Sequence, residues 1–107
     1  MIKAVYERSA NKLTVEGHAY GGEPGHDLIC ASASILVYTL ASFAKNVHKA
    51  RQVKKLKIKL DEGCAVVSFK AKKRYRVAIT LVCDAICAGF ELLARNYPEN
   101  ISYEIKF

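Results

Sequence analysis

The sequence lacks the features of secreted, membrane-spanning and multidomain proteins. No N-terminal stretch combines a basic start, a long apolar run and a small-residue cleavage site, so no signal peptide is expected. The longest apolar segments are interrupted by Ser, Lys, Asp or Gly, short of the ~20 residues of a membrane helix. The chain has no low-complexity tract and no linker, and 107 residues suit one domain, 1–107. We therefore expect a single cytoplasmic domain that does not contact a membrane.

Cysteine is present, but not in the arrangement of a disulfide framework or a zinc site. No C-x-x-C pair occurs among the four, which are Cys30, Cys64, Cys83 and Cys87. Cys83 and Cys87 are four residues apart beside apolar neighbours, and Cys64 opens an apolar strand. All three are expected in the core, where cysteine behaves as a small apolar residue. Only Cys30 lies among turn and capping residues, and we expect neither a metal nor a cofactor.

Alternating apolar residues and turn signals predict the element order ββαββαβ. The predicted strands cover residues 2–7, 12–19, 53–60, 64–71 and 101–107. Asp27 is a good cap for a first helix running to about Val47, and a second helix covers about 76–96. This order predicts an α+β fold, a two-layer domain with a mainly antiparallel sheet and two long helices on one face.

The two predicted helices have more apolar residues than one buried face requires. The runs ILVYTLASFA (35–44) and VAITLVCDAICAGF (77–90) are apolar or small on more than one side. A two-layer domain of this size leaves part of each helix exposed, so the excess predicts a self-association surface and a homodimer.

Positive charge is concentrated in two segments. The net charge is +7, and Lys and Arg gather in 45–59 and 70–76. In VKKLKIKL, lysines alternate with leucine and isoleucine, which is typical of a half-buried strand with a solvated lysine face. An anionic partner such as RNA is the alternative explanation, although no recognised RNA-binding signature accompanies the charge.

The stretch GHAYGGEPGHDLICAS, residues 17–32, places a histidine, a glycine-rich segment and Asp-x-x-Cys close together. If Asp27 caps the helix, Cys30 is its third helical residue, where free N–H groups and the helix dipole favour a thiolate. The same N–H groups would stabilise an oxyanion. His18 ends the preceding strand on its polar side, in phase with Thr14 and Glu16. Cysteine beside an imidazole is a sufficient pair for acyl transfer.

The residues alone leave alternatives open at this stretch. Cysteine in a first helical turn can simply pack, and a histidine near a turn can simply be solvated. His26 is a competing base that is closer to Cys30 in sequence. Asp27 either caps the helix or orients a histidine, and sequence does not separate these roles.

The stretch GHAYGGEPGHDLICASAS resembles the signature of the ribosomal-processing cysteine protease family, G-H-A, a short Gly-rich segment and G-x-D-x-x-C-A-x-x-S. The resemblance extends to the chain length, the element order and the closing YPENISYEIKF. It implies Cys30 as nucleophile and His18 as base, with Asp27 and Ser34 at family positions of supporting role. It also implies a loop that moves as substrate enters, containing Gly21, Gly22 and Gly25.

The resemblance implies a cytoplasmic, homodimeric endopeptidase. Its substrate would be the N-terminal extension, often basic, of ribosomal protein twenty-seven of the bacterial large subunit. The strong positive charge departs from the family pattern, and contact with ribosomal RNA or an assembling particle is one use for it. Two rival functions remain at this point: a non-catalytic basic RNA-binding or ribosome-assembly module, and a thiol-dependent hydrolase of a small substrate.

Overall fold

The fold is known from a computed structural model that describes residues 1–18 and 26–107, with the side chains of His26 and Asp27 left aside. Its strands are β1 (Ile2–Glu7), β2 (Lys12–Glu16), β3 (Val53–Asp61), β4 (Cys64–Ala71) and β5 (Ile101–Lys106). Its long helices are α1 (His26–Lys49) and α2 (Arg76–Asn96), with short 3₁₀ turns η1 (Arg8–Ala10) and η2 (Lys73–Tyr75). The predicted ββαββαβ order is confirmed.

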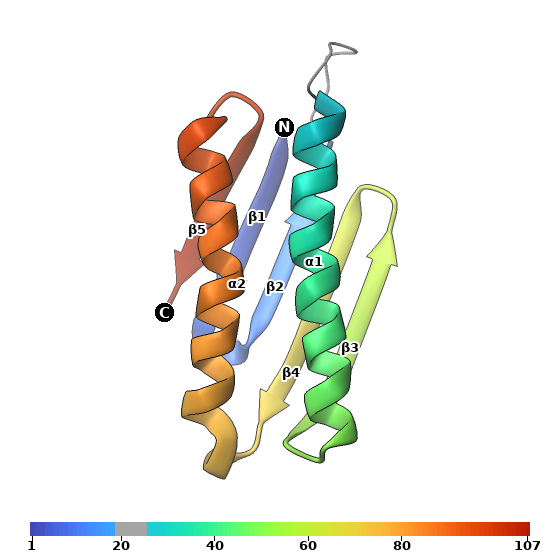
Figure 1. The fold of residues 1–107 in the computed structure, drawn as a ribbon, viewed down its shortest axis with the longest axis vertical. Coiled ribbons are helices and arrows are strands. Elements are labelled where there is room, and N and C mark those ends of the chain that lie inside the picture. Colours follow the sequence, from blue (N-terminus) through green and yellow to red (C-terminus); the bar gives the residue numbers. More distant parts are fainter. Residues whose placement is uncertain (19–25) are drawn as a thin grey trace.

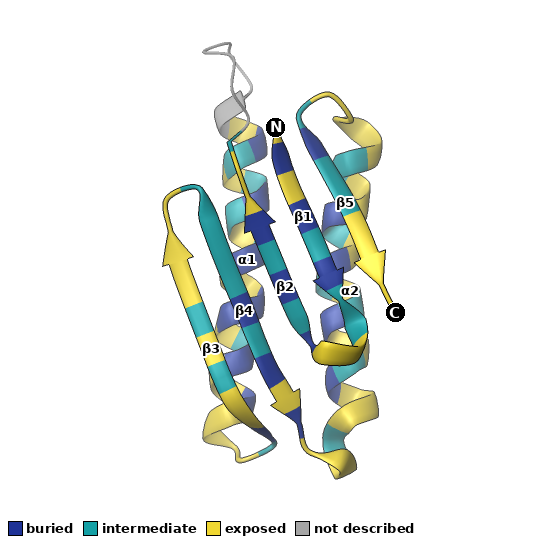
Figure 2. Ribbon diagram, turned by 180° about the vertical axis from the view of Figure 1, so that it is seen from behind, coloured by how far each residue is buried: buried dark blue, intermediate teal, exposed yellow. Residues whose placement is uncertain are grey.

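The five strands form one sheet in the order β3-β4-β2-β1-β5, and both long helices cover the same face of it (Figure 1). Every neighbouring pair is antiparallel except β1 and β5, which run parallel. Viewed from behind, the sheet presents its open face without a covering layer (Figure 2). The expected two-layer α+β architecture with a mainly antiparallel sheet is therefore confirmed.

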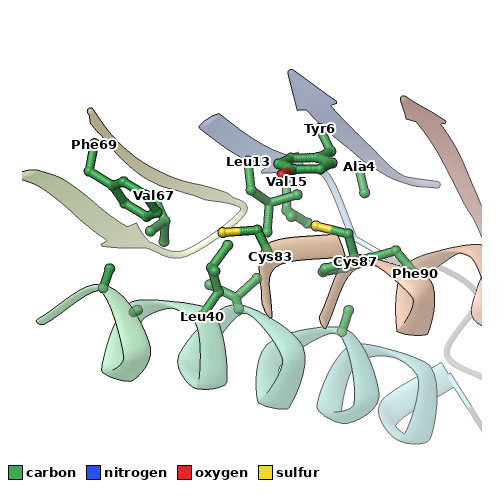
Figure 3. Close-up of a cluster of buried hydrophobic side chains, with 14 of the residues drawn as sticks. Ala4, Tyr6, Leu13, Val15, Leu40, Val67, Phe69, Cys83, Cys87 and Phe90 are labelled. Carbon is green, nitrogen blue, oxygen red and sulfur yellow. The ribbon is translucent and has the colours of Figure 1, made fainter. Parts of the chain in front are cut away.

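The core lies between the helices and the inner face of the sheet (Figure 3). Alternate strand residues enter it, as in β1, where Ile2, Ala4 and Tyr6 are buried and the residues between them are not. Cys83 and Cys87, one turn apart on α2, are each 1% exposed and pack beneath the sheet. These two cysteines occupy the core as expected.

One irregularity interrupts the pairing of the edge strand β3 with β4. Lys54 pairs with Lys70 and Lys57 pairs with Ser68, so β3 has one residue more than β4 over this interval. Lys55, inside this β-bulge, has a φ of 57°, which is uncommon for a residue with a Cβ atom. The bulge restarts the alternation of β3, so the lysines on both sides of it remain exposed.

Helix α1 begins earlier than the sequence predicted. It starts at His26, so Asp27 is its second residue rather than its cap, and Cys30 is the fifth. The predicted start of the helix was therefore too late, because several residue types can precede a helix and sequence rules locate its end only roughly. The helix also extends to Lys49, two residues beyond the predicted end at Val47.

Both long helices are exposed along one side and packed along the other. By length and apolar composition, two helical stretches are sufficient to cross a membrane, Leu28–Lys49 in α1 and Lys73–Asn96 over η2 and α2, so the expectation that none would qualify was too strict. The inner face of each helix contributes to the core, as Val37, Leu40 and Phe90 do. The outer faces leave large apolar side chains in solvent, among them Ile35 at 60% and Leu81 at 61% exposure.

Candidate active site

A pocket of about 410 Å³ opens at the end of the molecule where α1 begins and the turn between β3 and β4 lies. Three segments far apart in sequence form its walls: the end of β2, the first turns of α1 and the β3–β4 turn. Its volume lies within the usual range for ligand sites, about 300–1,000 Å³. Its polar and reactive lining residues among those described are His18, Cys30, Ser34, Tyr38, Asp61, Glu62 and Cys64.

Cys30 lies on the first turns of α1 and is half-buried in the pocket wall. Ser34, one helical turn later, lines the same pocket, as the spacing of four residues predicts. Because α1 starts at His26, the amide of Cys30 falls within the helical i→i−4 ladder. The free amides belong to the preceding turn, so Cys30 lies one turn inside the positive end of the helix.

His18 reaches this pocket because the chain leaves the strand at Gly17. Gly17 has a φ of +95°, a conformation that L side chains rarely adopt, and its N–H donates a 2.9 Å hydrogen bond to the carbonyl of Gly63. A Cβ atom on Gly17 would also collide with the carbonyl oxygen of Met1. The strand alternation that grouped His18 with Thr14 and Glu16 ends here. His18 instead lines the pocket together with Val15 and α1.

Gly63, in the β3–β4 turn, lies directly against the imidazole of His18. Its φ is +75°, and a Cβ atom built on it would lie 2.7 Å from Nε2 of His18, closer than real Cβ contacts. The pairing of β2 with β4, in which Glu16 is opposite Cys64, brings this turn beside residues 17 and 18. The absent side chain of Gly63 therefore provides the space that the imidazole occupies.

Sequence reasoning missed the contribution of the β3–β4 turn. Asp61 and Glu62 line the pocket, and they are its acidic members among the residues that the structure describes. Cys64 was expected in the core, but it is half-buried and lines the pocket beside Cys30. Only the long-range pairing of β2 with β4 places this turn at the site, and no local pattern signals that pairing.

The four cysteines are free thiols in two different environments. Burial raises the pKa of the Cys83 thiol to about 11 and that of the Cys87 thiol to about 12. Both therefore remain protonated and shielded at neutral pH. Cys30 and Cys64 instead contact the open pocket, so chemistry at sulfur is confined to this end of the molecule.

Other predicted residues lie outside the described part of the chain. Gly21, Gly22 and Gly25, the expected mobile loop, belong to the segment that the structure does not describe. The side chains of His26 and Asp27 also lie outside it, so their competing roles as base, orienting group or cap are not tested.

A thiol and an imidazole lining one open cavity of an α+β domain are the elements of a cysteine hydrolase. The comparisons with known proteins give this class a family. The sequence model of the family described as "Cysteine protease Prp" matches residues 1–102, and the chain belongs to that family. The non-catalytic alternative is therefore not supported.

Solved structures have the same fold at low sequence identity. The S. aureus ribosomal processing protease Prp with a covalently linked product peptide has a TM-score of 0.69 at 21% identity, covering 99% of this chain and 100% of its own. The same protease with a substrate peptide gives 0.67 at 19%, covering 98% and 97%. SMU.848 from Streptococcus mutans gives 0.68 at 21%, covering 98% and 91%. Comparison with curated protein sequences gives no match.

Proposed function

We propose that this protein is a cytoplasmic endopeptidase of ribosome maturation that removes the N-terminal extension of ribosomal protein twenty-seven of the bacterial large subunit. The observation that carries the proposal is the shared pocket of Cys30 and His18 in a chain of the Prp family. The similar S. aureus protease is described as a ribosomal processing enzyme and was solved with a covalently linked product peptide. Such a link is what a nucleophilic side chain forms with its substrate.

The proposed reaction assigns one step to each side chain. The Cys30 sulfur attacks the scissile carbonyl carbon, and His18 accepts the thiol proton as general base. The tetrahedral intermediate collapses as His18 returns that proton to the leaving amine, which leaves an acyl group on Cys30. A water molecule, deprotonated by His18, then hydrolyses this thioester and restores the free thiol. The positive end of α1, one turn before Cys30, stabilises the negative charge that develops in both steps.

The charge of the pocket matches a basic peptide although the protein itself is basic. Asp61 and Glu62 line the pocket, Asp61 in an exposed ion pair with Lys59, whereas the other cations of 45–59 and those of 70–76 provide most of the positive charge and do not line it. In the sheet, the β3–β4 turn and the start of β3 are at opposite ends of the strand. The net charge of +7 therefore does not oppose entry of a cationic tail at the pocket.

The proposed function is tested with a synthetic peptide that contains the ribosomal extension and the first residues of the mature protein. Mass spectrometry of the products should show cleavage at one bond. Casein and other unfolded proteins should remain intact, because a pocket of about 410 Å³ with acidic lining selects its peptide. General digestion of casein, or no cleavage of the extension peptide, would contradict the proposal.

We also propose that the enzyme is a symmetric homodimer formed through the exposed apolar faces of its helices. Ile35 on α1 and Leu81 on α2 are both more than half exposed, which is unfavourable in an isolated domain. Light scattering at micromolar concentration should give twice the chain mass of 11.9 kDa. Ile35→Glu should shift this mass towards the monomer, and Lys3→Glu, on the open face of β1, should leave it unchanged. A monomeric wild-type protein would refute the dimer.

A further inference from the structure

The end of the molecule opposite the pocket carries a group of cations that the proteolytic function does not use. We call this group the basic end; it lies on the last turns of α1, the first half of β3, the end of β4, and η2. Its members, all exposed, are Lys45, Lys49, Arg51, Lys54, Lys55, Lys57, Lys70, Lys72, Lys73, Arg74 and Arg76. Lys49 is separated from Cys30 by roughly 30 Å along α1, at ~1.5 Å per residue.

No acidic residue offsets this charge. The sequence contains no Asp or Glu from 28 to 60 or from 63 to 83. The ion pairs found in the described part of the chain join Arg8 to Asp84, Lys59 to Asp61 and Arg95 to Glu91, and none includes a member of the basic end. A solvated face of a globular domain ordinarily mixes both signs of charge, so the segregation itself requires an explanation.

The basic end contains a pair of like charges in the sheet, whereas charged pairs elsewhere in the sheet are of opposite sign. Where two charged residues are paired elsewhere in the sheet, they are opposite in sign: Lys3 with Glu16, and Glu7 with both Lys12 and Lys106. In β3 and β4, Lys54 is instead directly paired with Lys70. Like charges directly opposite each other destabilise a sheet, and this pair is retained against that cost.

Two further cations of the basic end are also retained at an energetic cost, here in the backbone conformation. Arg51 and Lys55 have φ values of 60° and 57°, where glycine or asparagine would be less strained. Protection of an edge strand against aggregation accounts for lysines on β3. It does not account for Lys70 on the interior strand β4, nor for the cations of η2 and Arg76.

We infer that the basic end binds the phosphate backbone of RNA. Dense positive charge without acids is the electrostatic feature that nucleic-acid backbones select, and it needs no sequence-specific signature. An anionic membrane would also attract the charge, but stable interfacial binding is ordinarily strengthened by a set of exposed apolar residues beside the cations. Residues 45–59 and 70–76, all described by the structure, include no large hydrophobic residue that is exposed, and Val77, directly after Arg76, is a single exposed apolar side chain beside the cations. The surface therefore fits RNA better than lipid.

The test uses a fluorescent RNA hairpin of arbitrary sequence and the full-length protein carrying Cys30→Ala, so that binding is measured apart from proteolysis. The affinity of the hairpin should fall linearly with the logarithm of salt concentration. The double variant Lys54→Gln/Lys70→Gln should reduce the magnitude of that slope by about two, because each lysine neutralises one phosphate. The double variant Lys3→Gln/Lys106→Gln removes the same charge elsewhere and should leave the slope unchanged.

Urea unfolding of the same variants separates binding from folding. Lys54→Gln/Lys70→Gln should raise the urea midpoint, because it removes a repulsive pair, although it weakens RNA binding. Lys3→Gln/Lys106→Gln should not raise it, because each of these lysines is paired with a carboxylate.

Three results would overturn the inference. Equal weakening of RNA binding by both double variants would show that net charge, and not the basic end, determines the affinity. Binding to phosphatidylglycerol vesicles without binding to the hairpin would assign the surface to lipid. A lower urea midpoint for Lys54→Gln/Lys70→Gln would show that these two lysines stabilise the fold, and their retention would then need no RNA.

Discussion

Replacement of Cys30 by alanine is expected to abolish cleavage of the extension peptide while leaving the fold intact. The side chain is half-buried at the pocket wall, so its removal deletes the nucleophile without emptying the core. In the folded wild-type protein at neutral pH, Cys30 should also react with iodoacetamide faster than the other three cysteines. Burial raises the pKa values of Cys83 and Cys87 to about 11 and about 12, so these thiols should not react. Peptide mapping by mass spectrometry after short exposure measures all four rates together.

Cys64 provides the matched control for Cys30, because it lines the same pocket with a similar exposure. Cys64→Ala should retain most of the peptide cleavage, since Cys64 opens a strand and has no helix N-terminus behind it. An inactive Cys64→Ala variant together with an active Cys30→Ala variant would show that Cys64, not Cys30, is the nucleophile. Equal alkylation rates for Cys30 and Cys64 would show that the N-terminus of α1 does not activate the Cys30 thiol.

Replacement of Gly63 by alanine is expected to lower kcat/KM by about 10²-fold, mainly through kcat, because a displacement of about 1 Å in a catalytic group costs that much. The new Cβ would lie 2.7 Å from Nε2 of His18, so the imidazole has to move away from the place it occupies. KM should change less than kcat, because the change in the pocket lining is confined to one methyl group and the displaced imidazole. Steady-state kinetics on the extension peptide separates the two parameters.

Two further variants distinguish the contact with His18 from strain in the turn. Gly63→Asn also introduces a Cβ atom, but asparagine tolerates positive φ, so the turn is relieved while the imidazole is still displaced. It should therefore be as inactive as Gly63→Ala and more stable to urea. Wild-type activity in Gly63→Asn would show that only the backbone conformation matters.

The double variant His18→Ala/Gly63→Ala gives the second distinction. His18→Ala alone should lose on the order of 10²–10⁴-fold, the usual contribution of a general base. Adding Gly63→Ala should cost no further activity, because the side chain it displaces is already absent. His26→Ala should cost far less than His18→Ala, because His18 lines the pocket with Cys30 and is the proposed base. Equal losses would assign the base to His26 instead.

The sequence was sufficient for the order and type of the elements because local signals determine them, although the strand predicted over 12–19 ends at Glu16 and α1 starts earlier than expected. The strands 2–7 and 64–71 and the helix 76–96 agree with the observed bounds, since alternation and helical periodicity both depend on near neighbours. The cysteine and histidine of the motif, twelve residues apart, do line one pocket, but the family resemblance rather than the local pattern singled out this pair.

The parts that sequence could not predict all depend on distant segments or on single backbone angles. Gly63, Asp61 and Cys64 reach the site only because β4 pairs with β2, a strand about fifty residues earlier in the chain. His18 departs from the strand alternation because one residue, Gly17, adopts positive φ. Neither a sheet order nor a dihedral angle is visible in a local pattern of apolar and polar residues.

The bulge in β3 means that this strand is one residue longer than its pairing with β4 requires. If Lys55 were removed, Val53, Leu56 and Ile58 would alternate without interruption with lysines 54, 57 and 59. Lys54 would still face Lys70, and Lys57 would still face Ser68. The sheet thus has a complete set of partners without Lys55. The chain retains a residue that contributes charge to the edge of the sheet and no backbone pairing.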